Sequence, residues 1–307
     1  MTFRTRFAPS STGPLHLGHA YSALLAQDIA HAASGDFLLR IEDIDQSRFR
    51  PHWEHQIYDD LTWLGLRWPS PVMRQSERTS AYNDALDSLW HGSLLFPCTC
   101  SRRDIQNAMS APQEGMPLDG PDGLIYPGTC NAERSMERTF PENNPRPTDV
   151  TLRLDMRSAV LANDIFDHRI ENADAPAQGY LSFHETGAGP NGETGLIEFT
   201  PQEMISGIGD IVLARNEMGT SYHLSVVLDD AAQGITHVVR GQDLFEATKI
   251  HVLLQRLLGL PTPVYHHHRL IRDETGKRLA KRDDARSIAT YRAEGKTADD
   301  IRIMVGL

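Results

Sequence analysis

The first 41 residues constrain the fold more than any other part of the chain. Residues 3–8 are typical of a short β-strand, and a loop rich in Pro, Ser, Thr and Gly follows them. Apolar residues then recur at helical spacing at Leu17, Ala20, Leu24 and Leu25, and residues 37–41, FLLRI, are typical of a buried strand. Strand, helix and strand in this order predict a βαβ unit, whose crossover requires parallel strands.

Two histidines, His16 and His19, stand at the expected start of this helix in the sequence HLGH. If the helix starts near Leu15, both imidazoles lie on one face of its first turn, where unpaired N–H groups and the helix dipole favour anions. Gly18 has no side chain that would obstruct a flat ligand. These features favour a nucleoside triphosphate bound by donors aimed at its phosphates. The alternative is a pair of surface histidines near a helix cap.

A basic loop, GKRLAKRDD, occupies residues 276–284. Its Lys281 could bring a mobile positive charge to a leaving pyrophosphate. The alternative is a solvated run of charged residues, which is the usual role of such a stretch.

The rest of the chain predicts alternating elements around a loop-rich insertion. We expect helices over residues 53–64, 80–90 and 243–258, strands over 150–154, 222–228, 235–240 and 264–271, and a short helical tail over 287–307. Residues 98–147 lose periodicity and accumulate Pro, Gly, Asn and Asp, and the Gly-rich residues 186–198 predict an exposed loop or hairpin. His266, His267 and His268 follow one another on an expected strand, so they cannot all face one site, and we expect a structural role for them.

Composition limits the class of protein. The 307 residues carry a net charge of −11, which argues against a general nucleic-acid coat protein but allows an enzyme with one basic face. Neither a membrane-spanning apolar run nor a signal peptide is evident, so a cytoplasmic protein is expected. All three cysteines, Cys98, Cys100 and Cys130, fall in one stretch, a pattern that favours a metal site over a disulfide.

Together these motifs resemble the class I aminoacyl-tRNA synthetases. HLGH and RLAKR look like the family's HIGH and KMSKS motifs, and RFAPSSTGPLHLGH followed by RIEDID resembles the glutamyl branch. The resemblance continues through DDLTWLGL, CTCSRRDI, YPGTC, VVLDD and VVRGQDL. It implies an α/β fold: a Rossmann-like catalytic core with a zinc-containing insertion and a small C-terminal helical region.

The resemblance also implies a set of site residues. ATP, with Mg²⁺, would be bound by His16, Gly18, His19 and Lys281, of which the two histidines and the lysine would be catalytic. Glutamate would be bound by Arg6, Ala8, Ser10, Glu42, Tyr222 and Arg240, with Glu42 holding its ammonium group and Arg240 a carboxylate. The alternatives are a buried structural ion pair for Arg240 and a core position for Tyr222. The loop departs from the family pattern at Ala280 and Arg282.

The cysteine cluster resembles the family's zinc site, which implies Cys98, Cys100, Tyr126 and Cys130 as ligands, with Tyr126 an unusual one. The alternative is three reduced, buried thiols. We expect the first half of the catalytic domain at 1–97, the zinc-binding insertion at 98–147, the remainder of the core at 148–271, and the KMSKS-like loop with a short helical region at 272–307.

Only about 25 residues follow Lys281, too few for a separate anticodon-binding domain. The chain therefore resembles the truncated glutamyl-queuosine tRNA(Asp) synthetases. Membership implies ATP-dependent activation of L-glutamate and its transfer to the cyclopentenediol of queuosine in the anticodon of tRNA(Asp), by an enzyme expected to be a monomer. The alternatives are a truncated glutamyl-tRNA synthetase that charges tRNA(Glu) and a non-catalytic tRNA-binding paralogue.

Overall fold

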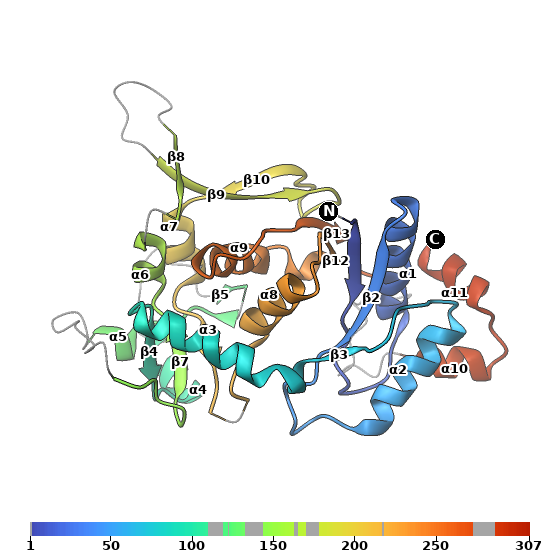
Figure 1. Cartoon of the computed structure of the whole chain (residues 1–307), viewed down its shortest axis with the longest axis horizontal. Coiled ribbons are helices and arrows are strands. Elements are labelled where there is room, and N and C mark those ends of the chain that lie inside the picture. The colour runs from blue at the N-terminus through green and yellow to red at the C-terminus, as the bar shows by residue number, and fades with distance from the viewer. Residues whose placement is uncertain are drawn as a thin grey trace.

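A computed structural model describes residues 2–109, 119–121, 123–132, 144–162, 165–169, 178–216, 218–272 and 286–307. One end of the molecule holds β1, β2 and α1, and the other holds β4, β7 and α3, with α8 and α9 between them (Figure 1). No helix in these described ranges is both long enough and apolar enough to cross a membrane.

The amino-terminal strands and helices form the predicted βαβ unit. Strands β1 (Arg4–Phe7), β2 (Asp36–Ile41) and β3 (Met73–Arg74) pair in parallel in the order β1-β2-β3. Helices α1 (Leu17–Ala32) and α2 (Pro51–Trp63) connect them. Their apolar faces share one core with the strands, which explains the sequence pattern from which they were predicted.

A second sheet continues the first. Its order is β10 (Gly195–Phe199), β9 (Gln178–Glu185), β13 (Val264–His268) and β12 (His237–Gly241), and β8 (Asp167–Arg169) pairs with β9. The amide of Thr236 donates to the carbonyl oxygen of Arg4 over 3.0 Å, which places the β12 edge beside β1. The carboxyl ends of β1, β2, β12 and β13 therefore face the same side, where ligands bind in open α/β sheets. The expected hairpin over residues 186–198 is confirmed as the β9–β10 connection.

The expected strand over residues 222–228 is wrong, because this segment is helix α8 (Tyr222–Ala232). Ser221 caps the helix by accepting the amide of Leu224. The helix is buried almost all round, so the sequence lacks an amphipathic pattern and its paired valines imitate a strand. The following helix is confirmed in shorter form as η3 (Gln242–Leu244) and α9 (Ala247–Leu257).

The middle of the chain builds the opposite end of the molecule. An antiparallel sheet has the order β11 (Val212–Ala214), β7 (Thr151–Leu154) and β4 (Leu95–Cys98). Around it lie η1 (Gln75–Arg78), α3 (Thr79–His91), α4 (Arg102–Met109), β5 (Asp119–Gly120), β6 (Gly123–Leu124), α5 (Thr129–Ala132), α6 (Met156–Leu161), α7 (Pro201–Glu203) and η2 (Met204–Ile208).

The last two helices return to the amino-terminal unit. In Figure 1, α10 (Ile288–Ala293) and α11 (Ala298–Val305) lie beside α1 and α2. Ile288, Tyr291, Ile301 and Val305 are buried in the same core as β1 and α1. Arg302 binds both carboxylate oxygens of Asp28 at 2.8 Å. The predicted C-terminal helical region is thus part of the first core.

Candidate functional site

A cavity of about 320 Å³ opens at the carboxyl ends of β1, β2 and β12. Its walls include the predicted residues Arg6, Ala8, His16, Gly18, His19, Glu42, Tyr222 and Arg240. Ser10 is the exception among the described candidates: it pairs with Glu42 through a backbone bridge beside the cavity and is not part of its wall. Lys281, Ala280 and Arg282 lie outside the described residues.

His16 is the N-cap of α1, so the helix begins two residues later than expected and Pro14 precedes it. The amide of Gly18 donates to His16 Nδ1 over 3.1 Å, and the amide of His16 donates to His19 Nδ1 over 3.2 Å. An imidazole whose Nδ1 accepts carries its proton on Nε2 when it is neutral. The two rings, 3.8 Å apart, are therefore fixed as Nε2–H donors on the cavity wall.

Gly18 is needed for this packing. A Cβ built on Gly18 would lie 3.0 Å from His16 Cε1 and 3.2 Å from His16 Nδ1. A side chain at this position would therefore crowd the His16 ring, whose Nδ1 accepts the Gly18 amide. Glycine thus suits both this packing and the access of a ligand to the helix start.

The described residues on either side of residues 273–285, which include the basic loop, lie at this cavity or at the start of α1. Ile271, just before it, lines the wall, and Ser287, just after it, forms a backbone bridge with His16. The amide of Ile288 donates to the carbonyl oxygen of Leu15 over 2.8 Å. The described residues before the basic loop therefore lie at the cavity, and those after it are bonded to the start of α1.

An ion-paired arginine cluster forms one part of the site. Arg6 Nε lies 2.9 Å and Arg6 Nη2 3.2 Å from the two carboxylate oxygens of Asp230. Arg40 Nη1 lies 2.7 Å from Asp230 Oδ1, and Arg40 Nη2 lies 3.1 Å from Glu42 Oε1. Arg6 thus lines the cavity with its charge already paired.

Burial and charge shift the pKa values in this cluster. Burial disfavours the charged form of Arg40, yet the carboxylates of Asp230, Glu42 and Asp229 raise its pKa. Burial outweighs Arg40 and Arg6 at Glu42 and raises the pKa of that carboxyl. At Asp230 the two guanidinium groups outweigh burial and lower the pKa. The charged form of Glu42 is therefore less well compensated than that of Asp230, and a further positive charge in the cavity would stabilise it.

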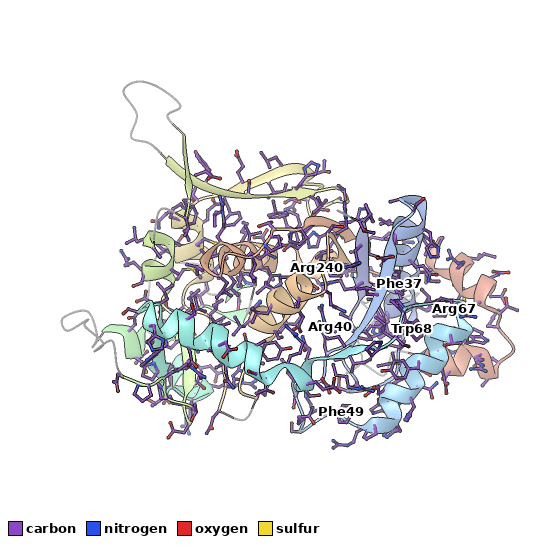
Figure 2. The ribbon with its side chains drawn as sticks, viewed as in Figure 1. Phe37, Arg40, Phe49, Arg67, Trp68 and Arg240 are labelled. Atoms are coloured by element: carbon purple, nitrogen blue, oxygen red, sulfur yellow. The ribbon has the colours of Figure 1, made fainter. Side chains whose placement is uncertain are left out.

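Arg240 is buried too and lies near the middle of the molecule (Figure 2), but its hydrogen-bond partners are neutral groups. Its Nε donates to His267 Nε2 over 3.0 Å, and its Nη1 lies 3.0 Å from His251 Nδ1. Its Nη2 donates to Thr248 Oγ1 over 2.7 Å and to the carbonyl oxygen of Leu244 over 3.3 Å. In the described part of the chain, Arg240 lies within 4.0 Å of no carboxylate, so the alternative of a structural ion pair does not apply.

Several residues at this site escaped the sequence analysis. Ser22, Asp243, Leu270 and His268 line the cavity, and His268 Nε2 lies 2.6 Å from Ser22 Oγ. His267, for which a structural role was expected, is buried and contacts Arg240. The sequence signal was present in the run of three histidines at a strand end, but only strand pairing shows that His267 meets Arg240.

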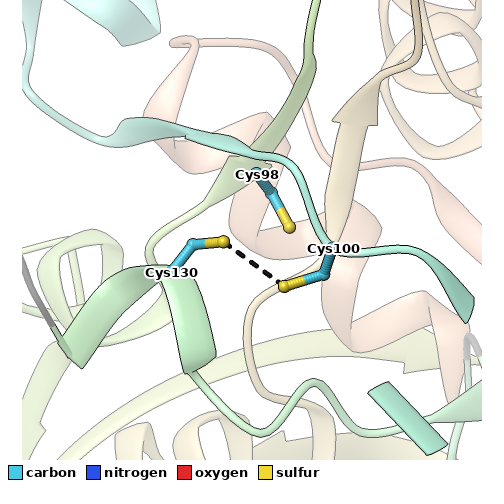
Figure 3. A group of neighbouring side chains, drawn as sticks. All are labelled: Cys98, Cys100 and Cys130. Carbon is cyan, nitrogen blue, oxygen red and sulfur yellow. Dashed lines mark hydrogen bonds between the residues drawn. The ribbon is translucent and has the colours of Figure 1, made fainter. Parts of the chain in front are cut away.

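The cysteine cluster lies away from this cavity, where β4 meets α5 (Figure 3). The three Sγ atoms lie within 4.8 Å of one another, and Cys100 Sγ lies 3.3 Å from Cys130 Sγ. The hydroxyl of Tyr126 lies 3.6 Å from Cys98 Sγ and 3.4 Å from Cys100 Sγ. A tetrahedral metal with bonds of about 2.3 Å to sulfur needs sulfur atoms about 3.8 Å apart, so this group could hold an ion.

The cluster also separates its thiols by acidity. Burial raises the pKa of Cys100 to about 11. At Cys130, hydrogen bonds from Tyr126 and Thr99 outweigh burial and lower the pKa to about 6. The thiol of Cys130 therefore loses its proton more readily than an ordinary cysteine, and a thiol must be deprotonated to bind a metal.

Comparison with known proteins agrees with this architecture. Residues 2–180 and 191–305 match the family of class I tRNA synthetases (E and Q), catalytic domain. A glutamyl-Q tRNA(Asp) synthetase of Rhodobacter capsulatus is 58% identical over 99% of both chains. One of Symbiobacterium thermophilum is 38% identical over 96% of this chain and 83% of its own.

Two solved structures share the fold: a glutamate tRNA ligase of Elizabethkingia meningosepticum in complex with its amino acid and a glutamate-tRNA synthetase of Elizabethkingia anophelis. Each has a TM-score of 0.63 and 24% identity over 92% of this chain, which spans 53% of theirs. The match over nearly the whole length of the Rhodobacter capsulatus relative, together with the family match, the fold and the cavity, shows that this chain is a class I aminoacyl-tRNA synthetase of the glutamyl-Q tRNA(Asp) synthetase family.

Proposed function

We propose that this enzyme activates L-glutamate with ATP and transfers it to the cyclopentenediol of queuosine in the anticodon of tRNA(Asp). The single observation that carries this function is the composition of one cavity, which combines two Nε2–H imidazoles, a partly buried carboxylate and a buried guanidinium that pairs with no carboxylate among the described residues. The relative that matches over 99% of both chains carries the name of this activity.

The two charged ends of glutamate fit opposite walls of the cavity. The carboxylate of Glu42 suits the α-ammonium group, and the guanidinium of Arg240 suits the side-chain carboxylate. Tyr222, at the start of α8, lines the same cavity. Arg6 and Ala8 line the glutamate side, and Ser10 holds the backbone of Glu42 from behind. The α-carboxylate of glutamate is then directed toward the start of α1.

ATP would lie along the start of α1. His16 and His19 would donate their Nε2–H groups to phosphate oxygens, and Gly18 would leave room above the helix. Lys281 would bind the leaving pyrophosphate. It is five residues from Arg286, so a fully extended chain keeps it within about 18 Å of that described end. Mg²⁺, when bound with the triphosphate, would neutralise phosphate charge.

The reaction has two steps. An oxygen of the glutamate α-carboxylate attacks the α-phosphorus of ATP, the bond to the bridging oxygen of the β-phosphate breaks, and pyrophosphate leaves. A hydroxyl of the cyclopentenediol then attacks the mixed-anhydride carbonyl, loses its proton, and AMP leaves. The side chains position the reactants and stabilise developing charge.

The cysteine cluster fits zinc as its ion. Three thiols and the phenol of Tyr126 supply four donors at tetrahedral spacing, and they connect β4 to the start of α5. Zinc would stabilise this connection, within an insertion that we place at residues 98–147. Elemental analysis of untagged protein should find about one zinc per chain, and Cys98→Ser should remove it. Full zinc content in Cys98→Ser would contradict this ligand set.

Two assays test the function. ATP–pyrophosphate exchange that depends on glutamate and occurs without tRNA is the expected result of the first. In the second, labelled glutamate should transfer to tRNA(Asp) with queuosine but not to tRNA(Asp) without it. Transfer to the 3′ end of tRNA(Glu) would indicate a truncated glutamyl-tRNA synthetase instead, and an absence of exchange would indicate a non-catalytic binder.

A further inference from the structure

A buried chain of three side chains runs behind the glutamate cavity. Glu185, at the end of β9, lies 2.5 Å from His267 Nδ1 through its Oε2. His267, on β13, accepts the Nε–H of Arg240 at its other ring nitrogen, over 3.0 Å. The side chains of Glu185 and His267 are both inaccessible to solvent. The chain therefore connects three neighbouring strands, and only Arg240 reaches the cavity.

The hydrogen bonds fix the tautomer of His267. Because Arg240 can only donate, His267 Nε2 must be the unprotonated nitrogen. His267 Nδ1 then carries the proton and donates it to the carboxylate of Glu185. The other oxygen of Glu185 accepts the amides of Gly187 over 2.7 Å and of His267 over 2.8 Å. Glu185 is therefore held by N–H donors and cannot turn toward Arg240.

The second face of Arg240 is also bounded by neutral groups. His251 Nδ1 accepts from Arg240, so its Nε2–H can donate to His223 Nδ1, which lies 3.1 Å away. Thr248 and the carbonyl oxygen of Leu244 take the remaining Nη2 hydrogens. Among the described residues, four of the five N–H groups of Arg240 have neutral partners, and one on Nη1 remains for a ligand.

We propose that Glu185 and His267 are positioning residues for substrate recognition. They orient Arg240 through a neutral imidazole, so that its plane is fixed while its charge stays available to the side-chain carboxylate of glutamate. A carboxylate in direct contact would have fixed the guanidinium equally well, but it would have paired the charge and excluded the substrate. The inference rests on the proposed function, since it assumes that Arg240 binds glutamate.

Two substitutions of His267 separate orientation from packing. An Asn amide takes roughly the place of Nδ1, whereas a Gln amide takes roughly the place of Nε2. His267→Asn therefore loses the acceptor for Arg240, and His267→Gln restores it. In ATP–pyrophosphate exchange, we expect His267→Asn to raise the KM for glutamate about 20-fold, with His267→Gln within about threefold of wild type. The KM for ATP should change in neither.

Glu185→Gln tests the far end of the chain. An amide at this position can donate to His267 Nδ1, which turns the imidazole into an Nε2–H donor that opposes the Nε–H of Arg240. We expect the KM for glutamate to rise about tenfold. His266→Asn is the matched control, because His266 lies on the same strand with its Nδ1 3.1 Å from Thr186 Oγ1 on the other face. It should leave the KM for glutamate unchanged.

The outcomes distinguish this inference from the proposed function. Exchange by wild type with equal glutamate KM values in His267→Asn and His267→Gln would overturn the positioning role and leave the function standing. Equal rises in KM for glutamate and for ATP, with a lowered melting temperature, would show a purely structural role and would also overturn the positioning role. An absence of exchange in wild type would overturn both proposals.

Discussion

Arg40 and Arg240 occupy equivalent places, near the carboxyl ends of β2 and β12. They differ in their partners, which are carboxylates for Arg40 and neutral groups for Arg240. Arg40 is completely buried and contacts the carboxylates of Asp230 and Glu42. Arg240 is 6% exposed and contacts two imidazoles, a hydroxyl and a carbonyl group. Figure 2 shows both near the middle of the molecule, and of the two only Arg240 lines the cavity.

The difference teaches how a fold divides its buried charges. A guanidinium between carboxylates is neutralised within the protein, and its removal leaves buried acids without a partner. A guanidinium among neutral acceptors keeps a net positive charge that a ligand can pair. We therefore infer a structural role for Arg40 and a role in substrate recognition for Arg240. Four experiments test these two roles and the site around them.

The largest expected effect is on activity at Arg240. Arg240→Gln should lower kcat/KM for glutamate in ATP–pyrophosphate exchange about 10³-fold, because a buried charge-assisted pair with the substrate is lost. Its melting temperature should change little, since no protein carboxylate loses a partner. Arg240→Lys should recover only part of the activity, because an ammonium group cannot reproduce the planar set of donors that fixes Arg240 to His267, His251 and Thr248. A strongly destabilised but active Arg240→Gln enzyme would reverse the division.

The second effect is on stability at Arg40. Arg40→Met should lower the free energy of unfolding by about 3 kcal/mol, because Asp230 and Glu42 stay buried with one cation fewer. Urea denaturation measures this change. Arg256→Met is the control: the Arg256–Asp167 pair is exposed, and its loss should cost less than about 1 kcal/mol. Equal costs at both positions would remove the distinction between buried and surface pairs.

The third effect is confined to the nucleotide side of the cavity. His19→Ala removes one Nε2–H donor and should lower the rate of adenylate formation about 10²-fold, while glutamate binding measured by calorimetry stays close to wild type. Lys281→Ala should act in the same direction, on the leaving pyrophosphate. Loss of glutamate binding in His19→Ala would show that the histidines and Arg240 serve one subsite.

The smallest effect is a pH dependence from Glu42. Burial raises the pKa of its carboxyl above 4.5, so Glu42 takes up a proton at higher pH than an ordinary glutamate. Protonation would remove the charge proposed to bind the α-ammonium group, so the KM for glutamate should rise several-fold as the pH falls to the raised pKa of Glu42. Glu42→Gln should have a high KM with no such acid limb. An unchanged acid limb in Glu42→Gln would assign the titration to another group.

Local sequence was enough for elements whose pattern reflects a single buried face. The parallel βαβ unit could be predicted from residues 3–41, because strands and helices have different periodicities and the buried residues of α1 recur at helical spacing. Residues 222–228 were wrongly predicted to be a strand, because α8 is buried almost all round and its sequence shows no clear helical periodicity. The start of α1 was misplaced by two residues, because His16 caps the helix with an imidazole.

The candidate site divides along the same line. By itself, the sequence determined that His16, Gly18 and His19 share a helix start, that three cysteines fall together, and that a basic loop exists far downstream, because these are facts of spacing and residue chemistry. Only the tertiary structure decided that Arg6 is paired with Asp230 and that Arg240 meets His267, His251 and Thr248. Those contacts join residues of different strands and helices, and the charge state of a buried arginine depends on which side chains the fold places around it rather than on its neighbours in sequence.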